Sequence, residues 1–186
     1  MKNLFLIFSI VLSFQLSAQN SNGLNFVDGW VKTNKGDTLK GKICYLNTKT
    51  GERLEKINFI DQAGAKKRLG SDRLDAFGTA TETFDFVDVG DGLGKLMMQR
   101  VVEGDLYLYF AWFKTEKSTP RLFDYEKAIF LKKKDKPDLV EVFDKKFEKD
   151  MARYFKGDED IVELMKKNSW GIADLDKIVK AYNEKE

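Results

Sequence analysis

The absence of histidine restricts the chemistry open to this chain more than any other feature of its composition. Without imidazole the chain has no Ser-His-Asp triad, no Cys-His nucleophile pair and none of the zinc sites that histidine helps to build. Carboxylates, lysines and tyrosines remain as acids, bases or nucleophiles. The 30 aspartates and glutamates will form close pairs by chance, so a carboxylate-based hydrolase is the least favoured function. The sequence identifies no catalytic residue, no metal site and no cofactor.

Two short motifs resemble ligand-binding loops. Residues 89–95, VGDGLGK, are rich in glycine, but they join two strand-like segments and lack the spacing of a phosphate-binding loop that precedes a helix. A turn is the favoured interpretation, with phosphate binding as the alternative. Asp85, Asp88 and Asp91 fit no EF-hand loop, and Asp85 and Asp88 would point to opposite faces of a strand. We expect a solvated turn here, with a weak calcium site as the alternative.

Aromatic and cationic side chains are the better candidates for a binding surface. Trp30 stands among lysines in residues 29–45, GWVKTNKGDTLKGKICY, and it either packs under a neighbouring segment or belongs to a recognition surface. Residues 106–113, LYLYFAWF, offer rings that could line a pocket for a small apolar ligand. The candidate binding residues are Trp30, Lys32, Lys42, Tyr107, Tyr109 and Trp112.

The opening segment predicts a β-hairpin with one apolar and one wet face. Setting Val31 opposite Gly41, with Lys35–Asp37 as the loop, keeps the apolar residues together, whereas a shift by one residue would mix the faces. The apolar face then holds Val27, Val31, Thr33, Leu39, Ile43 and Tyr45. The opposite face holds Lys32, Lys40, Lys42 and Trp30.

A second hairpin is predicted around residues 103–106. Gly104-Asp105 would form a two-residue loop in which the glycine supplies a positive φ. This register sets Arg100 opposite Tyr109 and predicts a cation–π contact between them. The second strand, 106–113, has no polar face, so it must be central and covered on both sides.

Strand patterns dominate from about residue 26 to 142 and helical patterns follow them. Further strands are expected at 55–61, 82–89, 95–102 and 121–133, while residues 71–78, SDRLDAFG, fit either a helical turn or a short strand. Three amphipathic helices are expected in the C-terminal segment. The first carries Phe143, Phe147, Met151 and Phe155 on one side, the second begins after Asp158 as N-cap, and the third spans about 173–183.

These patterns predict an α+β fold. It is an antiparallel meander or partly open barrel of about seven to nine strands, covered by about three C-terminal helices. The predicted organisation is a signal peptide at 1–18, a β-rich body at 19–142 and a helical segment at 143–186 packed on the sheet, the last two forming one globular domain. The helices should cover the aromatic strand at 106–113.

Residues 1–18 have the layout of a secretory signal peptide. Lys2 precedes the apolar run Leu4–Leu12, and small residues lead to an expected cleavage after Ala18. The run is shorter than the roughly 18 to 20 residues that a membrane-spanning helix needs, and no cysteine follows it to carry a lipid anchor. We therefore expect an exported protein, periplasmic or secreted, with no membrane span.

Beyond residue 18 the charges are nearly balanced. Only Lys2 is lost from the 32 lysines and arginines, and all 30 acidic residues remain. A nucleic-acid groove usually shows a clear basic excess, so we expect no nucleic-acid partner.

Three segments carry a resemblance to known proteins: GWVKTNKGDTLKGKI at 29–43, GDLYLYF at 104–110 and LDKIVKAYN at 175–183. They resemble a group of uncharacterised exported proteins of Gram-negative bacteria that share a G-x-V/I-x-T-x-x-G-D-T-L/I-x-G-x-I opening. The resemblance covers roughly residues 26 to 183. It implies a periplasmic or cell-envelope location, a β-rich body and a helical C-terminus, and it carries over no catalytic residue.

The sequence thus favours an exported, non-catalytic protein that binds a partner in the cell envelope. The main alternative is a carrier that encloses a small apolar ligand in its β-rich body. The partner is either an envelope protein or that ligand, and the oligomeric state stays open.

Overall fold

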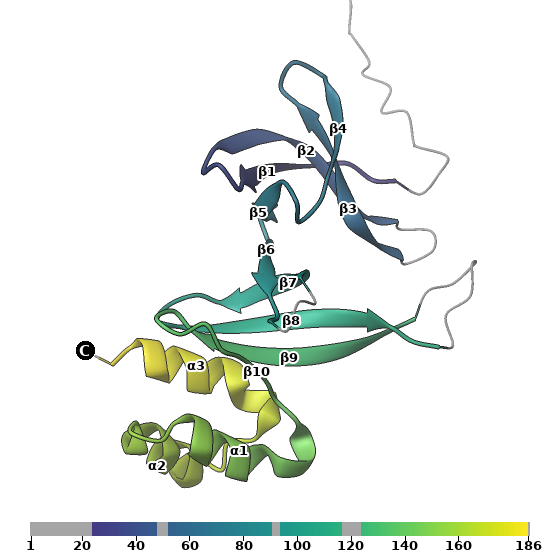
Figure 1. Cartoon of the computed structure of the whole chain (residues 1–186). Coiled ribbons are helices and arrows are strands. Elements are labelled where there is room, and N and C mark those ends of the chain that lie inside the picture. Colours follow the sequence, from purple (N-terminus) through teal and green to yellow (C-terminus); the bar gives the residue numbers. More distant parts are fainter. Residues whose placement is uncertain (1–23, 48–51, 91–93, 117–123, 186) are drawn as a thin grey trace, which may run out of the picture.

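A computed structural model describes residues 24–47, 52–90, 94–116 and 124–185, so the predicted signal peptide lies outside the described residues. The chain forms an antiparallel sheet of ten strands followed by three α-helices, which confirms the α+β class (Figure 1). The strands are β1 (Val27–Thr33), β2 (Thr38–Asn47), β3 (Glu52–Asp61), β4 (Lys66–Leu69), β5 (Leu74–Gly78), β6 (Thr83–Asp88), β7 (Lys95–Val102), β8 (Leu106–Lys114), β9 (Tyr125–Lys133) and β10 (Leu139–Glu141). The helices are α1 (Phe147–Tyr154), α2 (Glu159–Asn168) and α3 (Leu175–Asn183), with 3₁₀ turns at Asp144–Lys146 and Ile172–Asp174.

The strand count exceeds the predicted seven to nine because two short strands give almost no sequence signal. Residues 66–69 read KKRL, a charged edge strand of the kind that discourages pairing with other chains. At the other edge, β10 has only three residues. The ambiguous segment 71–78 contains β5, a strand rather than a helical turn. The predicted strand at 121–133 is observed from Tyr125, and residues 121–123 lie outside the described part of the chain.

The sheet is not a simple meander, because β5 returns to pair with β1 on the side away from β2. Strands β4 and β5 are four positions apart in the sheet, about 19 Å if it were flat. Yet only residues 70–73 join them, in a turn where Arg73 N donates to Gly70 O at 3.0 Å. Such a turn brings its ends within roughly 7 Å, so β1–β5 must curl around. The curl encloses buried side chains, among them Val31, Ile43, Ile57, Phe59, Leu74, Phe77 and Phe84.

The opening hairpin keeps its predicted faces but not its predicted register. Val31 pairs with Leu39 and Trp30 with Lys40, a shift of two residues from the expected pairing. Thr33 N donates to Asp37 O at 2.8 Å, which closes the loop one residue earlier than expected. Because side chains alternate with a period of two, this shift leaves every residue on its predicted face.

The hairpin between β7 and β8 also differs from the prediction. Arg100 does pair with Tyr109, but a bulge at Val101 then sets Val102 opposite Leu108, so the connection is longer than two residues. Gly104 is not among the glycines with positive φ. A Cβ at this position would overlap the side chain of Asn183, so close packing by α3 accounts for the glycine. The bulge turns Val102 towards the helices while Arg100 stays on the opposite face.

The C-terminal helices cover one face of the sheet at the end formed by β7–β9 (Figure 1). They bury Leu106, Leu108 and Leu131 against a core that includes Met151, Phe155, Ile161, Met165, Ile178 and Val179. This confirms the predicted helical cover for one face of the aromatic strand; on its other face, Tyr109 and Ala111 are buried against Met98 and Phe130 instead of under helices. None of the helices in the described residues is long and apolar enough to cross a membrane.

The structure corrects the start of the first predicted helix and confirms the N-cap position of the second. Phe143 precedes the first helix and is 55% exposed, so the buried side of α1 starts at Phe147. Asp158 occupies the N-cap position of α2 but makes no capping hydrogen bond with its side chain. Its carboxylate instead accepts hydrogen bonds from Lys133, at 3.0 Å, and Lys185, at 3.3 Å.

Candidate binding groove

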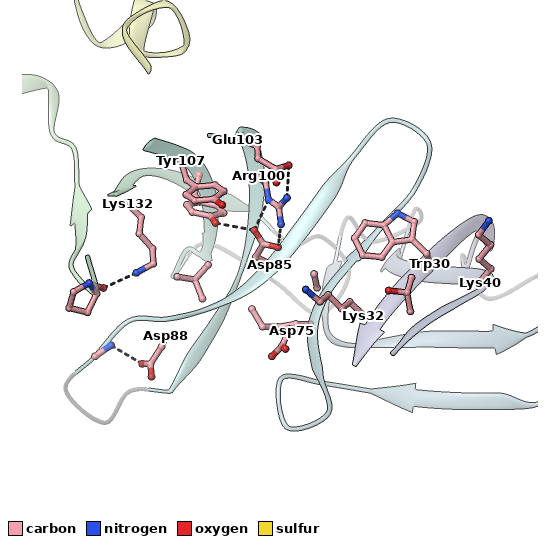
Figure 2. Close-up of a pocket in the computed structure, with 17 residues that line it drawn as sticks. Trp30, Lys32, Lys40, Asp75, Asp85, Asp88, Arg100, Glu103, Tyr107 and Lys132 are labelled. Carbon is pink, nitrogen blue, oxygen red and sulfur yellow. Dashed lines mark hydrogen bonds and ion pairs between the residues drawn. The ribbon is translucent and has the colours of Figure 1, made fainter. Parts of the chain in front are cut away.

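The face of the sheet opposite the helices carries the candidate site. Pairing places Trp30, Ala76, Asp85, Arg100 and Tyr109 on this outer face, whereas Val31, Phe77 and Phe84 point into the curled core. The outer face is hollowed into a groove of about 1040 Å³ that crosses the strands. Its lining includes Trp30, Lys32, Thr38, Lys40, Asp85, Val87, Arg100, Glu103, Tyr107, Tyr109 and Lys132 (Figure 2).

Arg100 is the centre of a hydrogen-bonded network in this groove. Its guanidinium donates to both carboxylate oxygens of Asp85, at 2.8 and 2.5 Å, and to Glu103 at 2.7 Å. The Tyr109 hydroxyl donates to Asp85 at 3.0 Å. The side chains of Arg100 and Asp85 are only 21% and 14% exposed. A bidentate, largely buried pair of this kind holds both groups in one geometry.

The network fixes the protonation of its members. Hydrogen bonds to Asp85 raise the pKa of Arg100 despite the opposing effect of burial. Burial, followed by the negative charge of Asp85, raises the pKa of Tyr109. Arg100 therefore stays charged and Tyr109 stays protonated, which suits a fixed framework better than proton transfer.

Tyr107 stands beside this network. The Arg100 guanidinium lies 5.8 Å from the centre of the Tyr107 ring, and the Tyr107 and Tyr109 rings stack with centroids 5.7 Å apart. The cation–π contact thus involves Tyr107, whereas the hydroxyl of Tyr109, the predicted partner, binds Asp85.

Trp30 lies at the other end of the groove, across the Asp85–Arg100 pair from Tyr107 (Figure 2). Its cross-strand neighbour is Gly78, and a Cβ on that glycine would lie 2.8 Å from the Trp30 ring. The indole therefore packs closely over a strand that has no side chain at this point. It is half-buried and lines the groove, so the indole packs on the sheet and part of it stays accessible.

The lysines of the groove differ in their partners. Lys132 donates to the backbone oxygens of Lys136 and Pro137 at 2.9 and 3.0 Å. Lys32 and Lys40 are exposed, and neither has an ion-pair partner within the described part of the chain. They flank Trp30 on β1 and β2, so their charges are available to a ligand that rests on the indole.

The structure divides the residues predicted from sequence into two groups. Trp30, Lys32, Tyr107 and Tyr109 come together in the groove. Lys42 is on the same face of the hairpin but does not line the groove. Trp112 points to the other face of β8, where it packs with the curled core and meets Phe110 edge-on at 6.3 Å.

Sequence reasoning did not identify the pair Asp85 and Arg100 as part of the site. Their contact spans β6 and β7 and depends on the pairing of Asp85 with Met98. An aspartate flanked by buried phenylalanines, in TFDFVD, was the available signal, because a charge in such a strand usually has a partner.

The described residues of the other two candidate motifs lie at the end of β6 and the start of β7. Asp88 Oδ1 accepts from Gly90 N at 2.9 Å, and Val89 N donates to Gly94 O at 3.1 Å, so residues 89–94 connect β6 to β7. Asp91 lies outside the described residues. The residues that the structure describes include no cluster of three or more potential metal-binding side chains.

The chain matches no family model, no curated protein and no solved structure. The resemblance to exported bacterial proteins therefore stays a prediction, and the functional argument rests on the groove itself.

Proposed function

We propose that this protein is a non-catalytic binding protein of the bacterial cell envelope and that the groove on the outer face is its binding site. The observation that carries the proposal is the position of Trp30 beside Lys32 and Lys40 in the lining of the groove. Aromatic residues beside cationic ones are typical of recognition surfaces. Export, and hence the envelope location, rests on the signal-peptide pattern of residues 1–18.

The state of the charged residues supports binding over catalysis. The charges of Arg100 and Asp85 neutralise each other, and the Tyr109 hydroxyl donates a hydrogen bond to Asp85. A general base or nucleophile needs a group with a pKa near the working pH and free access to the substrate. The pKa values of Arg100 and Tyr109 are raised, and Asp85 is held by hydrogen bonds from both of them.

A carrier with an enclosed apolar pocket has less support. Leu106 and Leu108 are buried beneath the helices, and Phe110 packs against the same core. On the other side of the strand, Tyr109 is only 5% exposed and packs in a buried cluster with Met98, Ala111 and Phe130, and Tyr107 packs against this cluster and lines the groove. The rings of β8 are therefore divided among packed clusters, with Tyr107 at the groove.

Native mass spectrometry of residues 19–186, purified from an exporting host, tests this function. Wild type and the double variant Lys32→Glu/Lys40→Glu would be compared, with Lys35→Glu as control because Lys35 lies in the hairpin loop outside the groove. We expect a bound species in wild type and the control that is absent from the double variant. Identical spectra for all three proteins would contradict the proposal.

A further inference from the structure

We infer that the groove takes an acidic glycan chain, an inference that rests on the proposed binding function and names its ligand. A pyranose ring presents C–H groups on its faces, hydroxyls around its edge and, in a uronic acid, one carboxylate. The groove offers a counterpart to each of these three features.

The first counterpart is a pair of aromatic side chains for the ring faces. Trp30 and Tyr107 both line the groove, and Figure 2 shows them on opposite sides of the Asp85–Arg100 pair. Each ring is held in place, Trp30 over Gly78 and Tyr107 against Tyr109 and Arg100. Rigid aromatic rings bury much apolar area at a small cost in conformational entropy. Two such rings suit a chain of several sugar units better than a single small molecule.

The second counterpart is a mixture of donors and acceptors for hydroxyl groups. A hydroxyl both donates and accepts hydrogen bonds, so a site for sugars needs acids as well as cations. Glu103 is 65% exposed at the rim, while Asp85 and Arg100 are fixed by one another in the floor. Side chains fixed in this way present their remaining hydrogen-bonding positions in a constant arrangement.

The third counterpart is the unpaired positive charge beside Trp30. Of the four acids that line the groove, Asp85 and Glu103 are bound to Arg100 and Asp75 is bound to Lys95 at 3.1 Å, while Asp88 accepts a hydrogen bond from Gly90 N. Lys32 and Lys40 lack such partners among the described residues. A carboxylate on a sugar ring that stacks on Trp30 would meet these two lysines, which favours an acidic over a neutral glycan.

The position of the groove argues against an extended acidic peptide. Peptides that bind sheets usually pair with an edge strand through their backbone hydrogen bonds. Here β1, β5, β6, β7 and β8 are all internal strands, so their backbone groups are already paired. A peptide lying on this face could form its backbone hydrogen bonds only with side chains of the groove.

The volume of the groove is consistent with an oligosaccharide. About 1040 Å³ is at the upper end of the range for ligand sites, roughly 300 to 1,000 Å³. Because the groove is open and crosses several strands, a long chain could extend beyond it at either end.

Calorimetric titration of the mature chain with three defined oligomers tests the inference: tetragalacturonate, maltotetraose and a tetraglutamate peptide. We expect tetragalacturonate to bind at least about tenfold more tightly than either of the others. Trp30→Ala and Lys32→Glu/Lys40→Glu should each weaken it by at least about tenfold, and Lys35→Glu by less than about threefold.

Three results would contradict the inference that the ligand is an acidic glycan. These are equal affinity for tetraglutamate, equal affinity for maltotetraose, and the absence of tetragalacturonate binding. If the native mass spectra still show a bound species that depends on Lys32 and Lys40, the binding function stands and only the ligand class is wrong. If substitution of the groove residues changes neither the native mass spectra nor the measured affinities, both proposals fail. Unchanged circular dichroism of the variants shows that they are folded.

Discussion

At the scale of single residues, Asn183 joins the last helix to the sheet. Its side-chain oxygen accepts from Leu106 N at 2.7 Å, and its nitrogen donates to Leu106 O at 2.9 Å. The amide therefore pairs with Leu106 as a neighbouring strand would. It lies directly over Gly104, where any side chain would occupy its place. This contact lies at the end of the β7–β8 hairpin that also carries Glu103 and Arg100 of the groove.

A double-mutant cycle tests this contact. Asn183→Ala removes the hydrogen bonds to Leu106, and Gly104→Ala displaces the Asn183 side chain, so each should cost about 1 to 3 kcal/mol of unfolding free energy. Because both changes break the same contact, the double variant should cost less than their sum by about 1 to 2 kcal/mol. Urea unfolding measures all three free energies.

Gly171→Ala is the control for this cycle, since a Cβ at that position meets nothing within 4 Å. It should change the unfolding free energy little. Additive costs for the Asn183 and Gly104 variants would show that the two residues do not interact.

At the scale of elements, ion pairs join the helical segment to β9. Lys133 on β9 is 12% exposed and donates to Asp158 at the start of α2, and it lies 4.9 Å from the centre of the Tyr182 ring on α3. Lys185, just after α3, also donates to Asp158 and to Asp160. One strand and two helices therefore meet at these charges.

Acid should weaken this junction. Although burial acts in the opposite direction, hydrogen bonds from Lys133 and Lys185 lower the pKa of Asp158 below 3.8 in the folded protein. A carboxyl with a lowered pKa stabilises the fold above its unfolded pKa and loses this effect as the pH falls through the folded value. Asp158→Asn should therefore cost up to about 1 kcal/mol at pH 7, and this difference from wild type should shrink as the pH falls through the lowered pKa of Asp158.

Urea unfolding of wild type and Asp158→Asn at several pH values measures this difference. Asp176→Asn is the matched control, because Asp176 pairs with Lys180 on the surface of α3 and does not join two elements. A pH-independent difference for Asp158→Asn would contradict the assignment.

The buried faces of the elements could be predicted from the sequence, but their register and their distant contacts could not. Period-two alternation identified the faces of β1 and β2, and four-residue spacing identified the buried side of α1 from Phe147 onwards. Alternation could not fix the register, because a shift by two residues preserves every face. The helix boundary at Phe147 and the partners of Asp158 depend on β9 and α3, which are distant in sequence or follow later in the chain. Local patterns carry no information on such contacts.

At the scale of the whole molecule, the sheet buries one face in two different ways. At the β1–β5 end the sheet curls around its own side chains, and at the β7–β9 end the helices cover it. The curl and the helices cover the same face of the sheet, since Phe77, Phe84 and Phe110 are on one side of the paired strands. The outer face carries a third, smaller buried cluster, formed by Val87, Met98, Tyr109, Ala111 and Phe130, and the groove lies beside it.

This arrangement explains why only half of the candidate site could be predicted. Trp30 and Tyr107 were identifiable as aromatics on definable strand faces, but they are 77 residues apart, and β5, β6 and β7 lie between their strands. The return of β5 to β1 brings them to one surface, and nothing in the local sequence of residues 70–73 specifies that pairing. The Asp85–Arg100 pair depends on the same topology.

The central claim is that ligand binds on the outer face, and the three tryptophans of the chain report on it separately. Trp30 lines the groove, Trp112 packs on the opposite face and Trp170 packs in the helical core. The most direct measurement is a titration of the three ¹⁵N-labelled indole N–H signals with tetragalacturonate. The structure predicts that the Trp30 signal shifts and that the Trp112 and Trp170 signals stay in place. A shift of Trp112 or Trp170 with Trp30 unchanged would contradict it.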